Sequence, residues 1–145
     1  MARTITRNIE KDKYRSEACI VWCSDARFWE MMYEFVKLEE YRYPDIIMMD
    51  GGAKDLASDD FRKRDILSSQ ILNSINRHST RSVILMMHAG CEAYDREFYQ
   101  DTEEIQFYTE ELKKAKEGLQ FALGGDTLRI RTFFADFYGL TEFYT

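Results

Sequence analysis

The chain has 145 residues, of which 45% are hydrophobic and 32% charged, as in a globular domain that can bury a core. Its formal net charge of −6 argues against non-specific binding to nucleic acid. No apolar run approaches the ~20 residues that span a bilayer, and the first residues lack the apolar core of a secretion signal. We therefore expect a cytoplasmic protein with no membrane partner and no nucleic-acid partner.

The cysteines do not suggest a disulfide framework, because there are three of them and the expected compartment is reducing. Metal binding, catalysis and burial as free thiols remain. Cys19 lies inside an apolar run and is expected to be a buried structural thiol. Cys23 and Cys91 stand beside polar or titratable residues, so these two are the candidates for chemistry.

The first part of the chain predicts an arm, a strand and a helix. Residues 1–17 carry mixed charge and are interpreted as a surface arm or a short helix. The run 18–22 is short, apolar and partly β-branched or aromatic, as expected of a strand covered on both faces. From Phe28 to Leu38, apolar residues recur at spacings of three and four, which predicts an amphipathic helix.

The middle of the chain predicts two further strands separated by a helix. The apolar run 46–49 is a second candidate buried strand, and the glycine-containing turn 50–53 ends it. Ser58 and the acidic residues after it indicate a helix start, and this helix should end near His78. The run 82–87 is the third predicted strand.

The last part predicts a long helix and two strands. Asp101 and Glu104 resemble a capping box at the start of the helix, and Gly124–Gly125 is a suitable stop. Polar–apolar alternation begins a strand over 128–137, and 140–144 is a short edge strand.

The element order predicts one α/β domain over 18–145, preceded by the arm 1–17. A βαβαβαβ order with a final short strand favours three layers, α/β/α, around a central mostly parallel sheet. We expect the strand order 2-1-3-4 with a short final edge strand. Such sheets bind ligands beyond the carboxyl ends of strands where the order reverses, here between the first and third strands.

The turn Cys23-Ser24-Asp25-Ala26-Arg27 follows the first predicted strand directly. Taken alone, it could hold a reactive thiol stabilised by Arg27, or Asp25 and Arg27 could be a surface ion pair worth under ~1 kcal/mol. A phosphatase-type phosphate loop is excluded, because its cysteine and arginine stand further apart than Cys23 and Arg27.

A second turn with possible metal ligands, His88-Ala89-Gly90-Cys91, follows the third predicted strand. The predicted strand order brings it to Cys23, and two thiolates with an imidazole suit a tetrahedral zinc ion. A closed structural site would need a fourth ligand, and the only spare candidates are Cys19, inside its strand, and His78, near a helix end. An open site with a position for water or substrate is therefore favoured, and this favours catalysis.

These two motifs, Cys-x-Asp-x-Arg after the first core strand and His-x-x-Cys after the third, resemble those of the β-class carbonic anhydrases. The order of elements agrees over most of the chain. The resemblance implies one Zn²⁺ per chain, bound by Cys23, His88 and Cys91. It also implies that Asp25 accepts a hydrogen bond from zinc-bound water, or itself takes the fourth position in a resting form, while Arg27 holds Asp25 in place.

The activity implied by this resemblance is the reversible hydration of carbon dioxide to bicarbonate by a zinc-bound hydroxide. Two alternatives are hydrolysis of carbonyl sulfide or carbon disulfide by similar chemistry, and a non-catalytic zinc-binding module of the same fold. In the turns after the strands, Gly51, Gly52, Ala53 and Gly90 are candidate residues of the substrate pocket.

The resemblance further implies a homodimer or higher homo-oligomer, with the site near the interface. An aromatic tail is consistent with an interface, since one sheet can hardly bury all of it; core packing is the alternative for each residue. The tail consists of Phe133, Phe134, Phe137, Tyr138, Phe143 and Tyr144.

Overall fold

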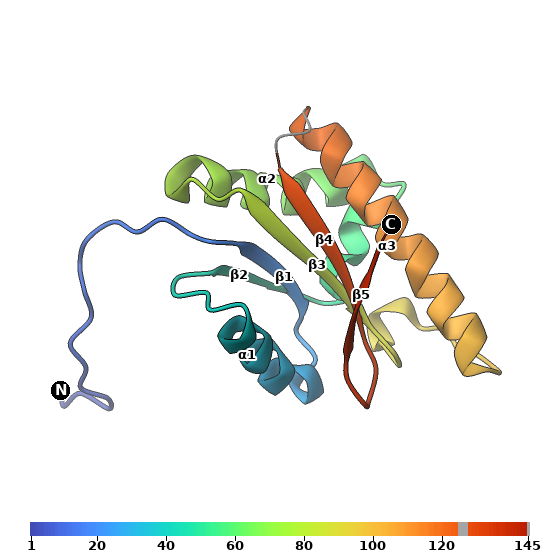
Figure 1. Cartoon of the computed structure of the whole chain (residues 1–145), viewed down its shortest axis with the longest axis horizontal. Coiled ribbons are helices and arrows are strands. Elements are labelled where there is room, and N and C mark those ends of the chain that lie inside the picture. Colours follow the sequence, from blue (N-terminus) through green and yellow to red (C-terminus); the bar gives the residue numbers. More distant parts are fainter. Residues whose placement is uncertain (125–127, 145) are drawn as a thin grey trace.

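The computed structural model describes residues 1–124 and 128–144, and a five-stranded sheet with the order β2-β1-β3-β4-β5 lies at its centre (Figure 1). The strands are β1 (Cys19–Cys23), β2 (Asp45–Met49), β3 (Ser82–His88), β4 (Arg129–Ala135) and β5 (Leu140–Phe143). The first four run parallel, and β5 pairs antiparallel with β4 at one edge. The predicted α/β fold and its strand order are confirmed.

Helices cover both faces of this sheet. The α-helices are α1 (Trp29–Leu38), α2 (Phe61–His78) and α3 (Asp101–Leu123), and the 3₁₀ turns are η1 (Ala26–Phe28), η2 (Gly52–Ala57) and η3 (Glu92–Tyr94). Consecutive strand residues point to opposite faces. Phe133 packs against Phe35 of α1, whereas Phe134 stacks on Tyr108 of α3, so α1 and α3 lie on opposite faces.

The ends of the longer helices are set by their neighbouring residues. Asp60 caps α2 by accepting a hydrogen bond from the Arg62 amide, so α2 begins at Phe61 rather than at Ser58. Gly124 ends α3 in the left-handed conformation, with φ of 66°. Gly125, the second residue of the predicted stop, lies outside the described residues. Among the described residues, no helix combines the length and apolar character that a membrane crossing needs.

The two central strands and the edge strand β2 are buried to different extents. β1 is buried along its whole length and β3 from Val83 onward, as continuous apolar runs between two helical layers require. The prediction of a buried strand over 46–49 is wrong in this respect. β2 lies at the edge of the sheet, and its residues alternate between half-buried and exposed. Ile46 and Met48 are 41% and 43% exposed.

The N-terminal arm is held against the sheet chiefly by its last residues. Tyr14 packs against the ring of His78 at a centroid distance of 4.0 Å and donates a 2.5 Å hydrogen bond to Asp45. The Ser16 amide also donates to the His78 carbonyl at 2.9 Å. Before Tyr14 the arm runs away from the sheet (Figure 1), and Ile5 is exposed.

The turn after β2 is held against the sheet by a glycine. Gly52 has φ of 60°, and a Cβ atom there would lie 2.2 Å from the Met86 carbonyl oxygen of β3. Only a glycine fits this close approach, since the backbone conformation and the space both exclude a side chain. η2 therefore packs directly beneath the ends of the central strands.

We predict that Gly52→Ala destabilises the protein by roughly 2–4 kcal/mol, because left-handed strain adds to an overpacked contact. The midpoint of urea unfolding measures this loss. Gly139→Ala is the matched control, since no atom lies within 4 Å of a Cβ atom built there. Equal midpoints for the two variants would contradict the assigned role of Gly52.

Candidate metal centre

The turns 23–27 and 88–91 lie next to each other at the carboxyl edge of the sheet. β1 pairs in parallel with β3, so Cys23 and His88, the last residues of these strands, lie at the same edge, and Cys91 follows in the next turn. The two Sγ atoms and a ring nitrogen lie within 4.8 Å of one another, and all three residues are buried. Ligand atoms on a tetrahedral zinc ion are roughly 3.5–3.8 Å apart, so small shifts of these side chains would suit one ion.

The imidazole of His88 has the tautomer that metal binding needs. Its Nδ1 atom lies 2.7 Å from the Ala89 carbonyl oxygen, which can only accept, so Nδ1 carries the proton. Nε2 is then a free acceptor, and it is buried with no hydrogen-bond partner among the described residues. An unpartnered buried nitrogen is costly unless something binds it. The donor set therefore fits a metal ion.

Asp25 is held beside this nitrogen by Arg27. The Arg27 backbone amide, Nε and Nη2 donate hydrogen bonds to the Asp25 carboxylate at 3.0, 3.1 and 2.7 Å. The guanidinium hydrogen bonds lower the pKa of Asp25 to about 2, so the carboxylate is ionised at neutral pH. Its Oδ2 atom lies 3.7 Å from Nε2 of His88.

The same arginine connects the two turns. Its Nη2 atom donates to the Gly90 carbonyl at 3.4 Å, and the guanidinium lies 5.3 Å from the ring centre of Phe137. Phe28 stacks on the His88 ring with centroids 4.2 Å apart, and Phe137 packs against Phe28. Aromatic rings thus cover one side of the imidazole and fix its plane.

The thiols of Cys23 and Cys91 are hydrogen-bonded to each other, and this shifts their pKa values in opposite directions. A hydrogen bond from Cys91, with a further contribution from His88, lowers the pKa of Cys23 to about 4 against the effect of burial. The pKa of Cys91 is raised by its hydrogen bond to the Cys23 thiolate and by burial. A metal ion binds thiolates, so binding to both cysteines would release the proton that the two thiols share.

A small open cavity of about 300 Å³ contains these groups. Its lining consists of Cys23, Ser24, Asp25, Arg27, Asp50, His88, Cys91 and Glu92. Asp50 and Glu92 were not among the predicted site residues, although each has a signal in the sequence. Asp50 directly follows β2, and Glu92 directly follows Cys91.

The glycine and alanine residues predicted for the substrate pocket lie elsewhere around the centre. Gly51, Gly52 and Ala53 are buried in the turn beneath the strand ends and do not line the cavity. Gly90 is exposed, and its carbonyl accepts the hydrogen bond from Arg27. Their part in binding a substrate stays a prediction.

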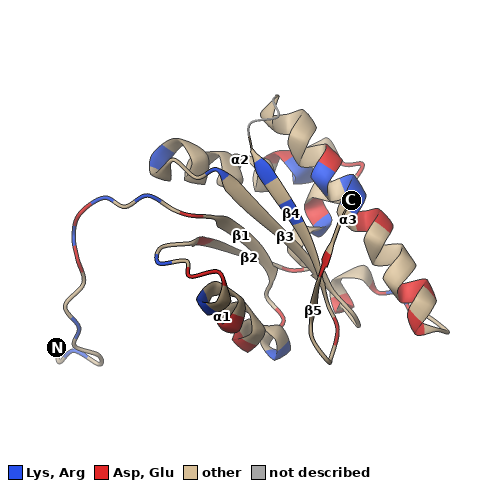
Figure 2. Ribbon diagram, viewed as in Figure 1, with Lys and Arg blue, Asp and Glu red and all other residues tan. Residues whose placement is uncertain are grey.

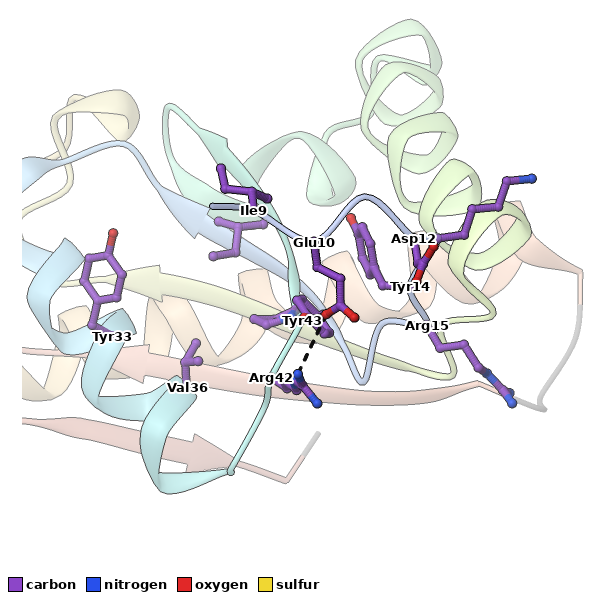
Figure 3. A pocket seen from close by; sticks show the side chains of 12 residues that line it. Ile9, Glu10, Asp12, Tyr14, Arg15, Tyr33, Val36, Arg42 and Tyr43 are labelled. Carbon is purple, nitrogen blue, oxygen red and sulfur yellow. Dashed lines mark hydrogen bonds and ion pairs between the residues drawn. The ribbon is translucent and has the colours of Figure 1, made fainter. Parts of the chain in front are cut away.

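A larger hollow lies away from this chemistry. A groove of about 710 Å³ is bounded by the arm, α1 and the start of β2. In Figure 3, Ile9, Tyr33 and Val36 line its apolar side, and Glu10 and Arg42 face each other at 4.0 Å. Within the described residues, the only group of three or more ligand side chains that could hold a metal ion is that of Cys23, His88 and Cys91. The smaller cavity is therefore the candidate site.

Two thiols and an imidazole at the carboxyl edge of a parallel sheet, beside an ionised carboxylate, form a group that could hold a metal ion in an α/β protein. The family described as "Putative carbonic anhydrase" matches residues 13–122, and the chain belongs to this family. A comparison with curated protein sequences gave no match.

Solved structures of carbonic anhydrases, one of them described as a β-carbonic anhydrase, share the fold. Isoform I from Trichomonas vaginalis matches with a TM-score of 0.63 and 12% identity, covering 94% of this chain and 87% of that one. The carbonic anhydrase of Streptococcus mutans matches with a TM-score of 0.60 and 16% identity, covering 90% of this chain and 82% of that one. The carbonic anhydrase from Glaciozyma antarctica matches with a TM-score of 0.58 and 16% identity, covering 90% of this chain and 83% of that one. The predicted membership of the β-carbonic anhydrase family is confirmed, and the low identities mark a divergent member.

We predict that the purified protein contains about one zinc ion per chain and that Cys91→Ser loses most of it, because two protein ligands hold zinc poorly. Elemental analysis after dialysis measures the content. Cys19→Ala is the matched control: this buried cysteine lies in β1 away from the cavity, and its loss costs roughly 1 kcal/mol of stability. Full zinc in Cys91→Ser would refute the ligand assignment.

Proposed function

We propose that this protein catalyses the reversible hydration of carbon dioxide to bicarbonate, with one Zn²⁺ per chain bound by Cys23, His88 and Cys91. The observation that carries the proposal is the buried Nε2 atom of His88, which has no hydrogen-bond partner among the described residues and faces two cysteines and the Asp25–Arg27 pair. When bound, zinc would supply a Lewis acid that makes water nucleophilic near neutral pH. Family membership and fold support this assignment.

Asp25 and Arg27 would position the water. Asp25 is ionised and can only accept, so it would take a hydrogen bond from the attacking water and turn its lone pair toward carbon dioxide. Arg27 fixes the carboxylate through hydrogen bonds from three of its nitrogen atoms and keeps it charged. A zinc ion alone would not need this pair, which is why we favour an enzyme over a binding module.

Asp25 could also bind the metal directly in a resting form. The 3.7 Å distance between its Oδ2 atom and Nε2 of His88 is close to the spacing of two ligands on one ion. In that form the carboxylate would occupy the position of the water, and Arg27 would compete with the metal for it.

We predict that Asp25→Asn keeps its zinc and lowers the hydration rate roughly 10- to 100-fold, since an amide cannot orient the water in the same way. Stopped-flow measurement of carbon dioxide hydration above pH 7, together with elemental analysis, tests both parts. Asp59→Asn, an exposed aspartate outside the cavity, controls for the change in net charge.

The wild-type assay also separates the alternatives. Turnover of carbonyl sulfide or carbon disulfide without hydration of carbon dioxide would replace the proposed reaction by a hydrolysis. A zinc-loaded protein that turns over none of these molecules would be a binding module. An unchanged rate in Asp25→Asn would remove that residue from the mechanism.

We further propose a homodimer that forms through α1 and the edge strand β2, in the cytoplasm as the sequence predicts. Trp29 and Tyr33 of α1 and Ile46 and Met48 of β2 are large apolar side chains, each more than two-fifths exposed. Exposed apolar residues beside a free strand edge are typical of an interface. The aromatic tail contributes less than expected, because Phe133 and Phe134 are buried in the core.

We predict a particle of twice 17.3 kDa in light scattering at micromolar concentration. Met48→Lys should shift it toward the monomer, because a charge would be buried at the interface. Phe121→Lys, which alters an exposed residue of α3, is the control. A monomeric wild type would contradict the dimer, and a dimeric Met48→Lys would move the interface elsewhere.

A further inference from the structure

The walls of the metal cavity carry two carboxylates that the proposed mechanism does not use. Asp50, at the end of β2, and Glu92, at the start of η3, line the cavity together with the cysteine and histidine ligands. Both side chains are exposed, and the hydrogen bonds of the described residues include none to either carboxylate from another side chain. A cavity of about 300 Å³ is roughly 8 Å across, so each charge lies within a Debye length of anything bound there.

The rest of the centre does not balance these charges. A divalent cation would neutralise the two thiolates, and Arg27 neutralises Asp25. Of the described residues that line the cavity, Arg27 alone carries a positive charge, and its guanidinium is committed to Asp25 and the Gly90 carbonyl. Asp50 and Glu92 therefore leave the loaded centre with a surplus of about two negative charges at neutral pH.

Lys54, in the turn η2, does not balance these charges either. The Lys54 ammonium donates a hydrogen bond to the Ala93 carbonyl and lies 5.0 Å from the ring centre of Tyr94. Lys54 does not line the cavity. Figure 2 shows other basic residues distributed over the arm, the helices, β4 and the connecting loops, interleaved with acidic ones.

The charge of Glu92 reaches the guanidinium beside it. The pKa of Arg27 is raised first by its hydrogen bond to Asp25, and Glu92 adds to this. The placement of Glu92 in the lining thus has an electrostatic counterpart.

We propose that Asp50 and Glu92 are specificity-determining residues that make the metal cavity select against anions, so that it accepts a small neutral substrate and releases an anionic product readily. This inference rests on the proposed zinc site and deepens the proposed function. An uncharged linear molecule enters without electrostatic cost, whereas bicarbonate meets two like charges on the wall. Bicarbonate would therefore bind more weakly, both as the product and as the substrate of the reverse reaction.

The test measures binding of an anion without turnover. Wild-type protein loaded with Co²⁺ is titrated with thiocyanate at pH 8, and the visible absorption of the cobalt centre reports binding. We expect Asp50→Asn and Glu92→Gln each to lower the dissociation constant about three- to tenfold, and the double variant about ten- to a hundredfold, as one or two nearby charges are removed.

Controls separate local charge from net charge and from shape. Asp59→Asn and Glu110→Gln remove exposed acidic residues outside the cavity and should leave the dissociation constant unchanged within about twofold, because screened distant charges act weakly. Imidazole, which is neutral at pH 8, should bind the wild type and both cavity variants equally, since asparagine and glutamine keep the size of the side chains.

The outcomes distinguish this inference from the proposed activity. Unchanged or weaker thiocyanate binding in both cavity variants would overturn the inference, even if carbon dioxide is hydrated. Tighter thiocyanate binding in a protein that turns over no substrate would uphold the inference and refute the activity. Failure of the wild type to bind cobalt would overturn both.

Discussion

The parallel pairing of β1 with β3 is the constraint on which the rest of the structure depends. Cys19 pairs with Val83 and Val21 with Leu85, so the two strands end within a residue of each other at the same edge. Side chains alternate along a strand, and a shift by one residue would turn Cys23 or His88 to the opposite face. The burial of both strands between helical layers fixes this register, and the register fixes the metal centre.

Because of this pairing, the fold and the meeting of Cys23, His88 and Cys91 could be predicted largely from the sequence. The apolar runs before Cys23 and His88 lack alternation, which identified them as central strands, and strand neighbours then brought the two turns together. β2 was misjudged because Ile46 to Met49 is as apolar as a central strand. Its exposed side chains are explained by a place at the edge of the sheet, and the composition of the run does not reveal that place.

The remainder of the site could not be predicted because it depends on how turns fold back in space. Gly52 was expected near the ligand, but the close approach of its backbone to Met86 shows that it supports the strand ends from below. Phe137 comes from the distant β4–β5 turn to pack against Phe28 and Arg27, a contact that no local pattern encodes. Tyr14 likewise anchors the arm through His78 and Asp45, residues from two other elements.

A metal ion and an anionic product would interact in opposite ways with the negative charge at this edge of the sheet. A metal ion is best held by thiolates in a negative surrounding, whereas an anionic product is best released by the same surrounding. Arg27 could have relieved the negative charge, but its nitrogen atoms are used to fix Asp25 and to connect the two turns. The arrangement thus uses its one cation for positioning and leaves the cavity wall acidic. A centre built this way would hold its metal and a neutral substrate while binding anions weakly. The reason is that the carboxylates of Asp50 and Glu92 attract a cation and repel an anion.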